Sequence, residues 1–155
     1  MGTTTLEYIA GFLDGDGSIF FQIVKTNTSC NPFKIRGSVL FSQKRENASI
    51  LEHLHQYFGV GYIRHRKTGV SDYTVVEPKE VERLLTLLRP YLILKKRHAQ
   101  LGLDILQRLK EQRSFEDFLE ICKLVDMFGT LNYSKKRTIT SKTVEDFFQH
   151  NIVPL

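Results

Sequence analysis

The chain has 155 residues, of which 41% are hydrophobic and 25% charged, so it is long enough for one globular domain with its own core. No run of eighteen apolar residues occurs, which excludes a membrane-spanning helix, and we expect no membrane partner. The formal net charge of +5 and the pI of about 9.2 favour a polyanionic partner without establishing one.

The chain contains two cysteines, Cys30 and Cys122, which lie far apart and lack the spacing of metal ligands. This pattern disfavours a disulfide or a zinc site and suits a reducing, intracellular compartment. The N-terminus has neither an Arg-rich leader nor a secretory segment. We therefore expect a protein that works where it is made, or one that has already lost a leader.

The first predicted helix begins at a cap among residues 3–5 and runs to about Leu13. Its apolar residues form two stripes at helical spacing, so both sides need a cover. Either both stripes lie inside one core, or one of them packs against a partner surface. The first stripe contains Leu6, Ile9, Ala10 and Leu13, and the second contains Tyr8, Gly11, Phe12 and Gly15.

Residues 14–17, with the sequence Asp-Gly-Asp-Gly, follow this helix. A dinucleotide-binding turn needs a third glycine and runs from strand into helix, and neither condition holds here. A calcium loop needs glycine at its sixth position and glutamate at its twelfth, where this sequence has Ile19 and Lys25. Two interpretations remain: a plain turn, or a hard-cation site in which Asp16, exposed beyond the helix by the glycines, binds Mg²⁺.

A period of two then predicts a hairpin with strands over about residues 18–29 and 34–44. The second strand has a cationic, hydrogen-bonding face and an apolar face. The metal site would lie beside the cationic face, which favours the binding interpretation of Asp16. The polar face carries Lys34, Arg36, Ser38 and Ser42, interrupted by Leu40, and the apolar face carries Ile35, Val39 and Phe41.

The rest of the chain predicts a second hairpin and five more helices. In this hairpin, Arg64 and Arg66 share a strand face with Tyr62, and Asp72 and Thr74 lie on the return strand. The five histidines show no metal-ligand spacing, and we place most of them on the surface. The helices are expected over about residues 46–58, 78–88, 96–112, 115–128 and 141–149, and the hairpin turns around residues 67–69.

The segment YIAGFLDGDGSI resembles the signature of the LAGLIDADG homing endonucleases, which cut long DNA sites. Four later segments are similar, in order, to the single-motif subgroup found in algal chloroplast introns, so the resemblance covers residues 6 to about 147. They are FGVGYIRHRKTGVSDYTV, LRPYLILKKRHAQ, FLEICKLVDMF and LNYSKKRTITSKTV. The resemblance implies an α+β fold with an αββαββα core, a saddle-shaped antiparallel sheet in the DNA major groove and additional C-terminal helices. It also implies one domain over residues 1–155 and a homodimer in which the first helices pack together.

The resemblance implies a site-specific endonuclease that recognises a long pseudo-palindromic site in double-stranded DNA and hydrolyses one phosphodiester per strand with Mg²⁺. Mn²⁺ is expected to substitute, Ca²⁺ to bind without cleavage, and no small-molecule cofactor is expected. The expected location is intracellular, in the chloroplast where the protein is encoded. The alternative is a catalytically silent intron-RNA splicing cofactor or DNA-binding regulator on the same fold, against which the intact Asp16 argues.

Individual roles follow by similarity at matching positions. Asp16 resembles the family's metal-binding acid, and the carbonyl of Gly15 resembles its neighbouring ligand. Gln43 is similar to the residue that orients the attacking water, and Lys95 to the lysine that stabilises charge near the scissile phosphate. The implied DNA contacts are Gln22, Thr26, Lys34, Arg36, Ser38, Ser42, Arg64, Arg66, Asp72 and Thr74, with Lys135 and Lys136 in a basic loop.

One position departs from the family pattern. Asn47 stands where relatives have a second basic residue of the active site. Either Lys44 or Arg45 compensates, or this step of the reaction depends less on charge in this chain.

Overall fold

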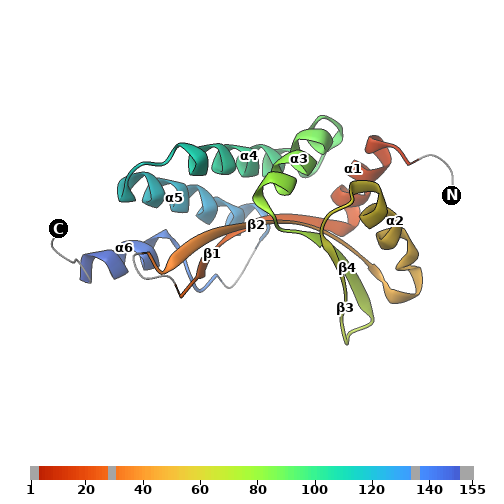
Figure 1. Cartoon of the computed structure of the whole chain (residues 1–155), viewed down its shortest axis with the longest axis horizontal. Helices are drawn as coiled ribbons and strands as arrows, with labels where there is room; N and C mark the ends of the chain where they lie inside the picture. Colours follow the sequence, from red (N-terminus) through yellow and green to blue (C-terminus); the bar gives the residue numbers. More distant parts are fainter. Residues whose placement is uncertain (1–3, 28–30, 134–136, 151–155) are drawn as a thin grey trace. The chain divides into compact units, whose positions relative to one another are not determined.

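The structure is a computed structural model, and it describes residues 4–27, 31–133 and 137–150. Within them the order is helix, two strands, helix, two strands and then further helices, as the sequence predicts (Figure 1). The elements are α1 (Leu6–Asp16), β1 (Gly17–Lys25), β2 (Phe33–Lys44), the short 3₁₀ helix η1 (Arg45–Asn47), α2 (Ser49–Phe58), β3 (Tyr62–His65), β4 (Val70–Val75), α3 (Pro78–Leu88), the 3₁₀ helix η2 (Arg89–Tyr91), α4 (Lys96–Glu111), α5 (Phe115–Leu131) and α6 (Ser141–His150).

The four strands form one sheet in the order β1-β2-β4-β3, and the strand β4 is antiparallel to both of its neighbours. The register places Ser42 of β2 opposite Asp72 of β4, which in turn lies opposite Arg64 of β3. Side chains at directly paired positions point to the same face of a sheet. The polar positions predicted on the two hairpins therefore gather on one face of three neighbouring strands.

The contacts within the chain define two compact units: residues 1–20 with 37–103, and residues 21–36 with 104–155. The boundary falls within β1, β2 and α4, so these elements contribute residues to both units. The single domain over residues 1–155 stays a prediction. The first unit buries apolar residues of α1, α2, α3 and the strands, including Ile9, Leu13, Leu54, Tyr73 and Leu84.

Thr5 caps the N-terminus of the helix α1, because its hydroxyl accepts the backbone N–H of Tyr8 at 3.1 Å, so the predicted N-terminal cap is confirmed. The helix ends at Asp16 rather than near Leu13, which corrects the expectation that Asp16 lies beyond the helix. Gly17 is in an extended conformation, with φ −119° and ψ −174°, and not in a left-handed turn.

Close packing explains the glycine at position 17. A Cβ atom there would lie 2.6 Å from Cδ1 of Leu13 and 2.7 Å from the carbonyl oxygen of Leu40. These distances are far below normal contact, so only glycine lets α1 turn directly into the strand β1 at this point. The sequence predicted that glycine is needed for backbone freedom, whereas the structure requires it for the absence of a side chain.

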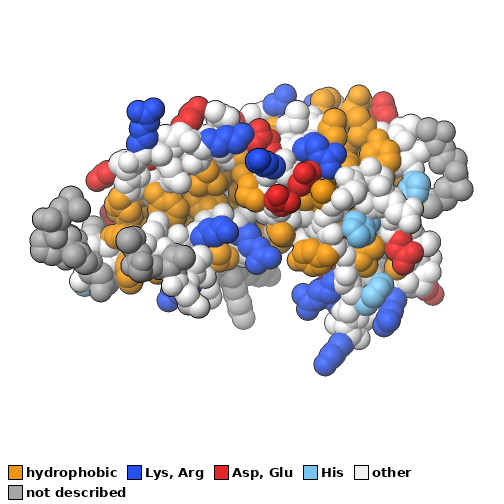
Figure 2. Space-filling model, viewed as in Figure 1, with side chains coloured by type: hydrophobic (Ala, Val, Ile, Leu, Met, Phe, Trp, Pro, Cys, Tyr) orange, Lys and Arg blue, Asp and Glu red, His pale blue; other side chains and the backbone are white. Residues whose placement is uncertain are grey.

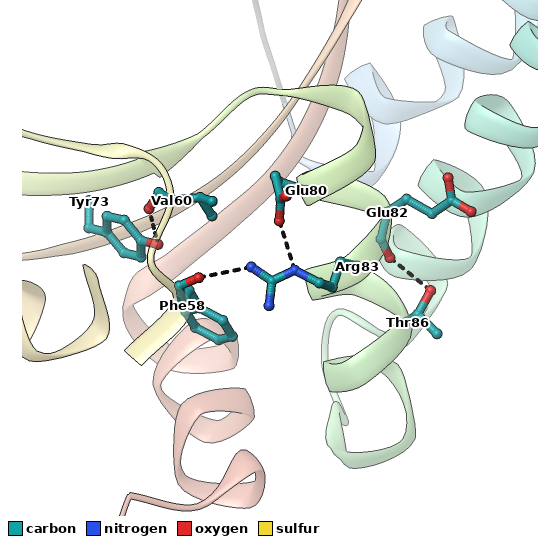
Figure 3. A network of polar contacts seen from close by, with 7 residues as sticks. All are labelled: Phe58, Val60, Tyr73, Glu80, Glu82, Arg83 and Thr86. Carbon is teal, nitrogen blue, oxygen red and sulfur yellow. Dashed lines mark hydrogen bonds and ion pairs between the residues drawn. The ribbon is translucent and has the colours of Figure 1, made fainter. Parts of the chain in front are cut away.

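A network of polar contacts anchors the second hairpin (Figure 3). Tyr73 of β4 donates its hydroxyl to the carbonyl of Val60 at 2.6 Å. Arg83 of α3 donates to the carbonyl of Phe58 at 2.9 Å and to the carboxylate of Glu80 at 2.7 Å (Figure 3). Burial raises the pKa of Tyr73 to about 12, so the phenol remains a donor at neutral pH. The segment between α2 and β3 is therefore tied to both β4 and α3.

The second unit is held by aromatic contacts. Phe21 stacks on Phe128 with ring centroids 5.3 Å apart, and Phe115 of α5 meets Phe148 of α6 at 4.2 Å. Asp126 of α5 accepts the backbone N–H of Ser141 at 3.1 Å, which fixes the start of α6. Over residues 4–27, 31–133 and 137–150, no helix has the length and apolar character needed to cross a membrane.

Candidate active site and nucleic-acid interface

The last turn of α1 is bound to the loop that precedes α4 by four hydrogen bonds. Oδ2 of Asp14 accepts the backbone N–H of Ile93 at 2.7 Å and that of Leu94 at 3.2 Å. Oδ1 of Asp14 accepts the N–H of Lys95 at 3.0 Å. In the other direction, Nζ of Lys95 donates to the backbone carbonyl of Asp14 at 2.6 Å. The predicted catalytic lysine is thus fixed to the end of α1.

The predicted metal ligands lie at the same helix end. Asp16 and Gly15 are exposed, and a Cβ atom at Gly15 would meet nothing within 4 Å. Two residues are separated by about 200° around a helix, so Asp16 points away from the loop that Asp14 binds. Within the part of the chain that the structure describes, the Asp16 carboxylate makes no hydrogen bond or ion pair. This carboxylate is available to a ligand.

A carboxylate and a backbone carbonyl are the oxygen donors that a hard cation such as Mg²⁺ takes, so Asp16 and Gly15 fit that ion. Among the described residues, no group of three or more His, Cys, Asp or Glu residues could hold a metal by itself. The remaining ligands would have to be water, phosphate oxygens or groups from a second copy of the chain. Mg²⁺ typically binds in this way, through few protein ligands together with phosphates.

Gln43 lies near the end of β2, is half-buried, and accepts the backbone N–H of Lys44 through Oε1 at 3.0 Å. It shares a strand face with Phe41, whose ring lies 5.7 Å from that of Phe12 on α1. Gln43 is therefore on the face of the sheet that packs against α1. No measured contact joins Gln43 to Asp16, so its role stays a prediction.

The residues around the departure at Asn47 are all exposed. Asn47 ends η1, and Lys44 and Arg45 precede it. The backbone N–H of Arg45 donates to the carbonyl of Gly69 at 2.9 Å, which ties η1 to the turn of the second hairpin. Both cationic side chains remain candidates for the missing positive charge.

The polar face of the sheet contains a buried carboxylate that holds one of the two hairpin arginines. Asp72, with its side chain 8% exposed, accepts Nη2–H of Arg66 at 3.1 Å, and Nε of Arg66 lies 2.9 Å from its Oδ2. Ser42 donates its hydroxyl to the same carboxylate at 2.6 Å. Arg64 lies opposite Asp72 in the strand register but is exposed and makes no ion pair among the described residues. The structure therefore pairs Asp72 with Arg66 and not with Arg64.

Other cations on the strands are unpaired. Lys34 and Arg36 are exposed at alternate positions of β2, and the structure records no acidic partner for them in the described ranges. Lys and Arg side chains also gather over the β3–β4 hairpin (Figure 2). Cations without partners attract phosphates, whereas paired ones are largely neutralised.

The remaining predicted DNA contacts differ in accessibility. Gln22 and Thr26 are half-buried. Ser38 is 2% exposed and Thr74 is 7% exposed, so solvent barely reaches either side chain. Their roles stay predictions. Lys135 and Lys136 lie outside the described residues.

Sequence reasoning missed Asp14. Its position as the first acid of the Asp-Gly-Asp-Gly segment was visible, but the partner segment lies about 80 residues along the chain. The histidines were expected mostly at the surface, and His98 of α4 is instead 9% exposed. The position of Asp14 at the end of an apolar helix could have indicated its role, since a carboxylate there needs hydrogen-bond donors.

A helix with an acid at its exposed end, followed by an antiparallel sheet with exposed cations, is the arrangement expected from the resemblance to DNA-cutting α+β proteins. A family model described as LAGLIDADG endonuclease matches residues 9–107. The chain therefore belongs to the LAGLIDADG endonuclease family, and the resemblance seen in the sequence is confirmed.

Individual relatives agree. The DNA endonuclease I-CreI of Chlamydomonas reinhardtii is 45% identical over 142 residues, covering 90% of this chain and 85% of that protein. The DNA endonuclease I-CvuI of Chlorella vulgaris is 33% identical over 139 residues, covering 90% and 86%. The crystal structure of I-CvuI with the I-CreI target in 2 mM Mg, in which the DNA is not cleaved, superposes with a TM-score of 0.89 at 31% identity, over 97% of this chain and 96% of that one. The predicted fold class is confirmed.

Proposed function

We propose that this chain is a site-specific DNA endonuclease that recognises a long pseudo-palindromic site and hydrolyses one phosphodiester in each strand. The observation that carries the proposal is the exposed carboxylate of Asp16, which has no partner among the described residues and lies at the end of α1 to which Lys95 is bound. Family membership and 45% identity to a DNA endonuclease support it.

Asp16 and the carbonyl of Gly15 would hold Mg²⁺, and their oxygen donors suit that ion. When bound, the metal supplies an activated water and stabilises charge on the attacking and leaving oxygens. Lys95 would neutralise charge on the scissile phosphate, and Gln43 would orient the attacking water. Mn²⁺ would substitute for Mg²⁺, and Ca²⁺ would support binding without cleavage. Crystal structures of I-CvuI bound to DNA in the presence of Mg or Ca are consistent with a divalent ion.

The chain would act as a homodimer, because two strands must be cut and each chain has one such site. The exposed side of α1 carries Tyr8, with 53% of its surface exposed, and Gly11, beside which a Cβ atom would meet nothing within 4 Å. Ile93 and Leu94 are 84% and 71% exposed. Small and apolar residues on a helix face allow a second helix to approach closely. Phe12, predicted on this stripe, instead packs against Phe41.

The strands would read the DNA. Arginine can donate two hydrogen bonds to guanine in the major groove, and each such pair discriminates between bases by about 1–3 kcal/mol. Arg64 and Arg36 have no acidic partner in the described ranges and could do so, and Arg66 is held in one orientation by Asp72. The remaining contacts to bases and phosphates would come from Lys34, Gln22, Thr26, Ser38, Ser42, Thr74, Lys135 and Lys136.

We further propose that residues 1–155 work as a single endonuclease domain, and that the protein acts inside the chloroplast whose intron encodes it. The photosynthetic sources of the two relatives, Chlamydomonas reinhardtii and Chlorella vulgaris, support this location. The other candidate function is a catalytically silent splicing cofactor or DNA-binding regulator. The exposed carboxylate of Asp16 argues against this alternative, because a protein that does not cleave DNA has no need of a metal-binding acid there.

The decisive experiment selects cleaved sequences from a partly randomised library derived from the I-CreI target, with Mg²⁺ in one arm and Ca²⁺ in the other. We expect double-strand cuts with Mg²⁺ and binding without cuts with Ca²⁺, and the selected sites should show two-fold symmetry. Binding of DNA or intron RNA without cutting in Mg²⁺ or Mn²⁺ would favour the silent alternative. The symmetry of the selected sites tests the homodimer at the same time.

A further inference from the structure

We propose that Asp14 is a positioning residue that places the ammonium group of Lys95 for cleavage. This inference rests on the proposed function, because it assigns Asp14 a task in the same site. Asp14 itself would touch neither the metal nor the DNA. Its effect on the reaction would pass entirely through Lys95 and the loop that carries it.

The loop at residues 93–95 depends on Asp14 for its conformation. Ile93 and Leu94 are 84% and 71% exposed, so their side chains bury little apolar surface that could fix the backbone. The Asp14 carboxylate instead accepts three consecutive backbone N–H groups, at 2.7, 3.2 and 3.0 Å. Hydrogen bonds to an ionised acceptor are about twice as strong as neutral ones. The carboxylate therefore sets the path of this loop.

The same loop leads into α4. The carbonyl of Lys95 accepts the N–H of Ala99 at 3.0 Å, so Lys95 is the residue at which the helix α4 begins to form its hydrogen bonds. A negative charge close to a helix N-terminus is favourable because the first N–H groups lack partners within the helix. Asp14 thus fixes both the position of Lys95 and the direction in which its helix starts.

The side chain of Lys95 is held by the same residue. Its Nζ donates to the backbone carbonyl of Asp14 at 2.6 Å. Carbonyls in the last turn of a helix lack partners within that helix, and a lysine ammonium is a suitable donor for them. The ammonium therefore binds the backbone of α1 at the residue that precedes Asp16, the proposed metal ligand, by two positions. One residue connects the two charged groups that the reaction needs.

Replacement of Asp14 by asparagine removes hydrogen-bond acceptors for the loop while keeping the size of the side chain. Asparagine has nearly the same shape, but only one of its two terminal atoms accepts a hydrogen bond, and the other is a donor. The variant must therefore turn a donor towards at least one of the N–H groups of Ile93, Leu94 and Lys95. Asp14→Glu keeps both acceptor oxygens and the charge but adds a methylene, so it should retain part of the cleavage rate that Asp14→Asn loses.

The test is a double-mutant cycle on the full chain, using a DNA site that the wild type cuts. Single-turnover cleavage with Mg²⁺ and DNA binding with Ca²⁺ are measured for D14N, K95M, Q43A and the two double variants. We expect D14N to slow cleavage about 10- to 100-fold, as small misplacements of catalytic groups do, with binding changed by no more than about threefold. In the K95M background D14N should add little, whereas in the Q43A background it should show its full effect.

A purely structural role predicts equal losses in all three backgrounds, and that result would overturn the proposal. Amide hydrogen exchange supplies a readout without DNA: exchange at residues 93–95 should speed up in D14N and recover in D14E. Unchanged exchange there would refute the inference on its own. A wild type that cuts no DNA would instead count against the proposed endonuclease.

Discussion

The guanidinium of Arg66 is bound by the buried carboxylate of Asp72, with Nη2 3.1 Å from Oδ1 and Nε 2.9 Å from Oδ2. Ser42, on the neighbouring strand, donates to the same carboxylate at 2.6 Å. The side chain of Arg66 is 40% exposed, so solvent still reaches part of it while Asp72 sets its orientation. Arg64 lies opposite Asp72 without such a partner in the described residues, so the two arginines are not equivalent.

Asp72→Asn should relax base preference at the position that Arg66 contacts. The amide loses the charge of the ion pair and turns its NH₂ group towards either Nε or Nη2 of Arg66, so the guanidinium loses its fixed orientation. We expect preference for the best base to fall about tenfold, the lower part of the 1–3 kcal/mol that a bidentate contact supplies. Cleavage profiling on the partly randomised library measures this. Arg66→Ala identifies the position, and in that background Asp72→Asn should change nothing further there; an unaltered profile for Asp72→Asn alone would contradict the prediction.

Asp16→Asn should abolish cleavage in Mg²⁺ and leave most DNA binding in place, because it removes the proposed metal ligand without altering the cationic strand face. We expect the cutting rate to fall by at least about 10³-fold, in line with the loss of a group that stabilises transition-state charge. Glu7→Gln is the matched control, since it neutralises another exposed acid on the same helix and should cut normally. Retained cutting by Asp16→Asn would show that another group binds the metal.

Gly17→Ala should destabilise the fold. The new Cβ would lie 2.6 Å from Cδ1 of Leu13 and 2.7 Å from the Leu40 carbonyl, and overpacking of this kind costs about 1–3 kcal/mol. Gly129→Ala is the control, because a Cβ atom at Gly129 would approach no atom of Arg137 closer than 3.4 Å. Gly129 lies in the helix α5, and within a helix alanine is favoured over glycine by about 1 kcal/mol. Thermal unfolding should show a lower midpoint for the first variant only, and equal shifts in both would disprove the close approach at Gly17.

Gly11→Leu should separate the proposed dimer. A bulky side chain on the open face of α1 would keep two helices apart, and because the contact is symmetric the cost arises twice. At about 1–3 kcal/mol for each copy, the dissociation constant should rise about 30-fold or more. Light scattering across a concentration series measures this, with Gln56→Leu on the exposed side of α2 as the control. If Gly11→Leu remains a dimer, the partner surface is elsewhere.

Stability should decline at alkaline pH through Cys122. Burial, with a smaller contribution from Asp126, raises the pKa of this thiol from 9.0 to about 12. The folded state holds the proton more tightly, so this contribution is fully present below about pH 9 and is lost as the pH rises towards 12. The unfolding free energy should fall by up to about 1.4 kcal/mol per pH unit in that range.

The measurement is chemical unfolding between pH 7 and 11 for the wild type and Cys122→Ala. The variant should begin its decline about one pH unit later, where Tyr73, whose pKa is raised from 10.0 to about 12, starts to contribute in the same direction. Its lower overall stability, caused by the smaller side chain, does not affect this comparison. Curves that fall in parallel over the whole range would exclude Cys122 as the source.

The order of the elements and some of their bounds could be predicted, because periodicity and caps are local. Thr5 caps the first helix as expected, and the helix α3 has the predicted limits, Pro78–Leu88. The end of α1 could not be predicted, because Asp14 meets a loop about 80 residues away. Likewise, Arg64 and Arg66 have the same strand parity, so only the folded register and side-chain packing decide which of them Asp72 holds.

The candidate site was predictable only as far as residue type and order allow. Asp16 and Lys95 were named from the resemblance, but their connection through Asp14 depends on three-dimensional contacts. The burial of Ser38 was hidden for a related reason. Alternation assigns a face to a residue, and the size of its neighbours on that face decides whether solvent reaches it.

The supports of the second hairpin are separate from its exposed side chains. Tyr73 and Arg83 secure the backbone at Val60 and Phe58, while Arg64 projects from the strand without taking part in that network. Substitutions at the outward positions would therefore change the proposed base contacts with little loss of folding stability. For an engineer, this division makes the hairpin a replaceable recognition module on a constant nuclease scaffold.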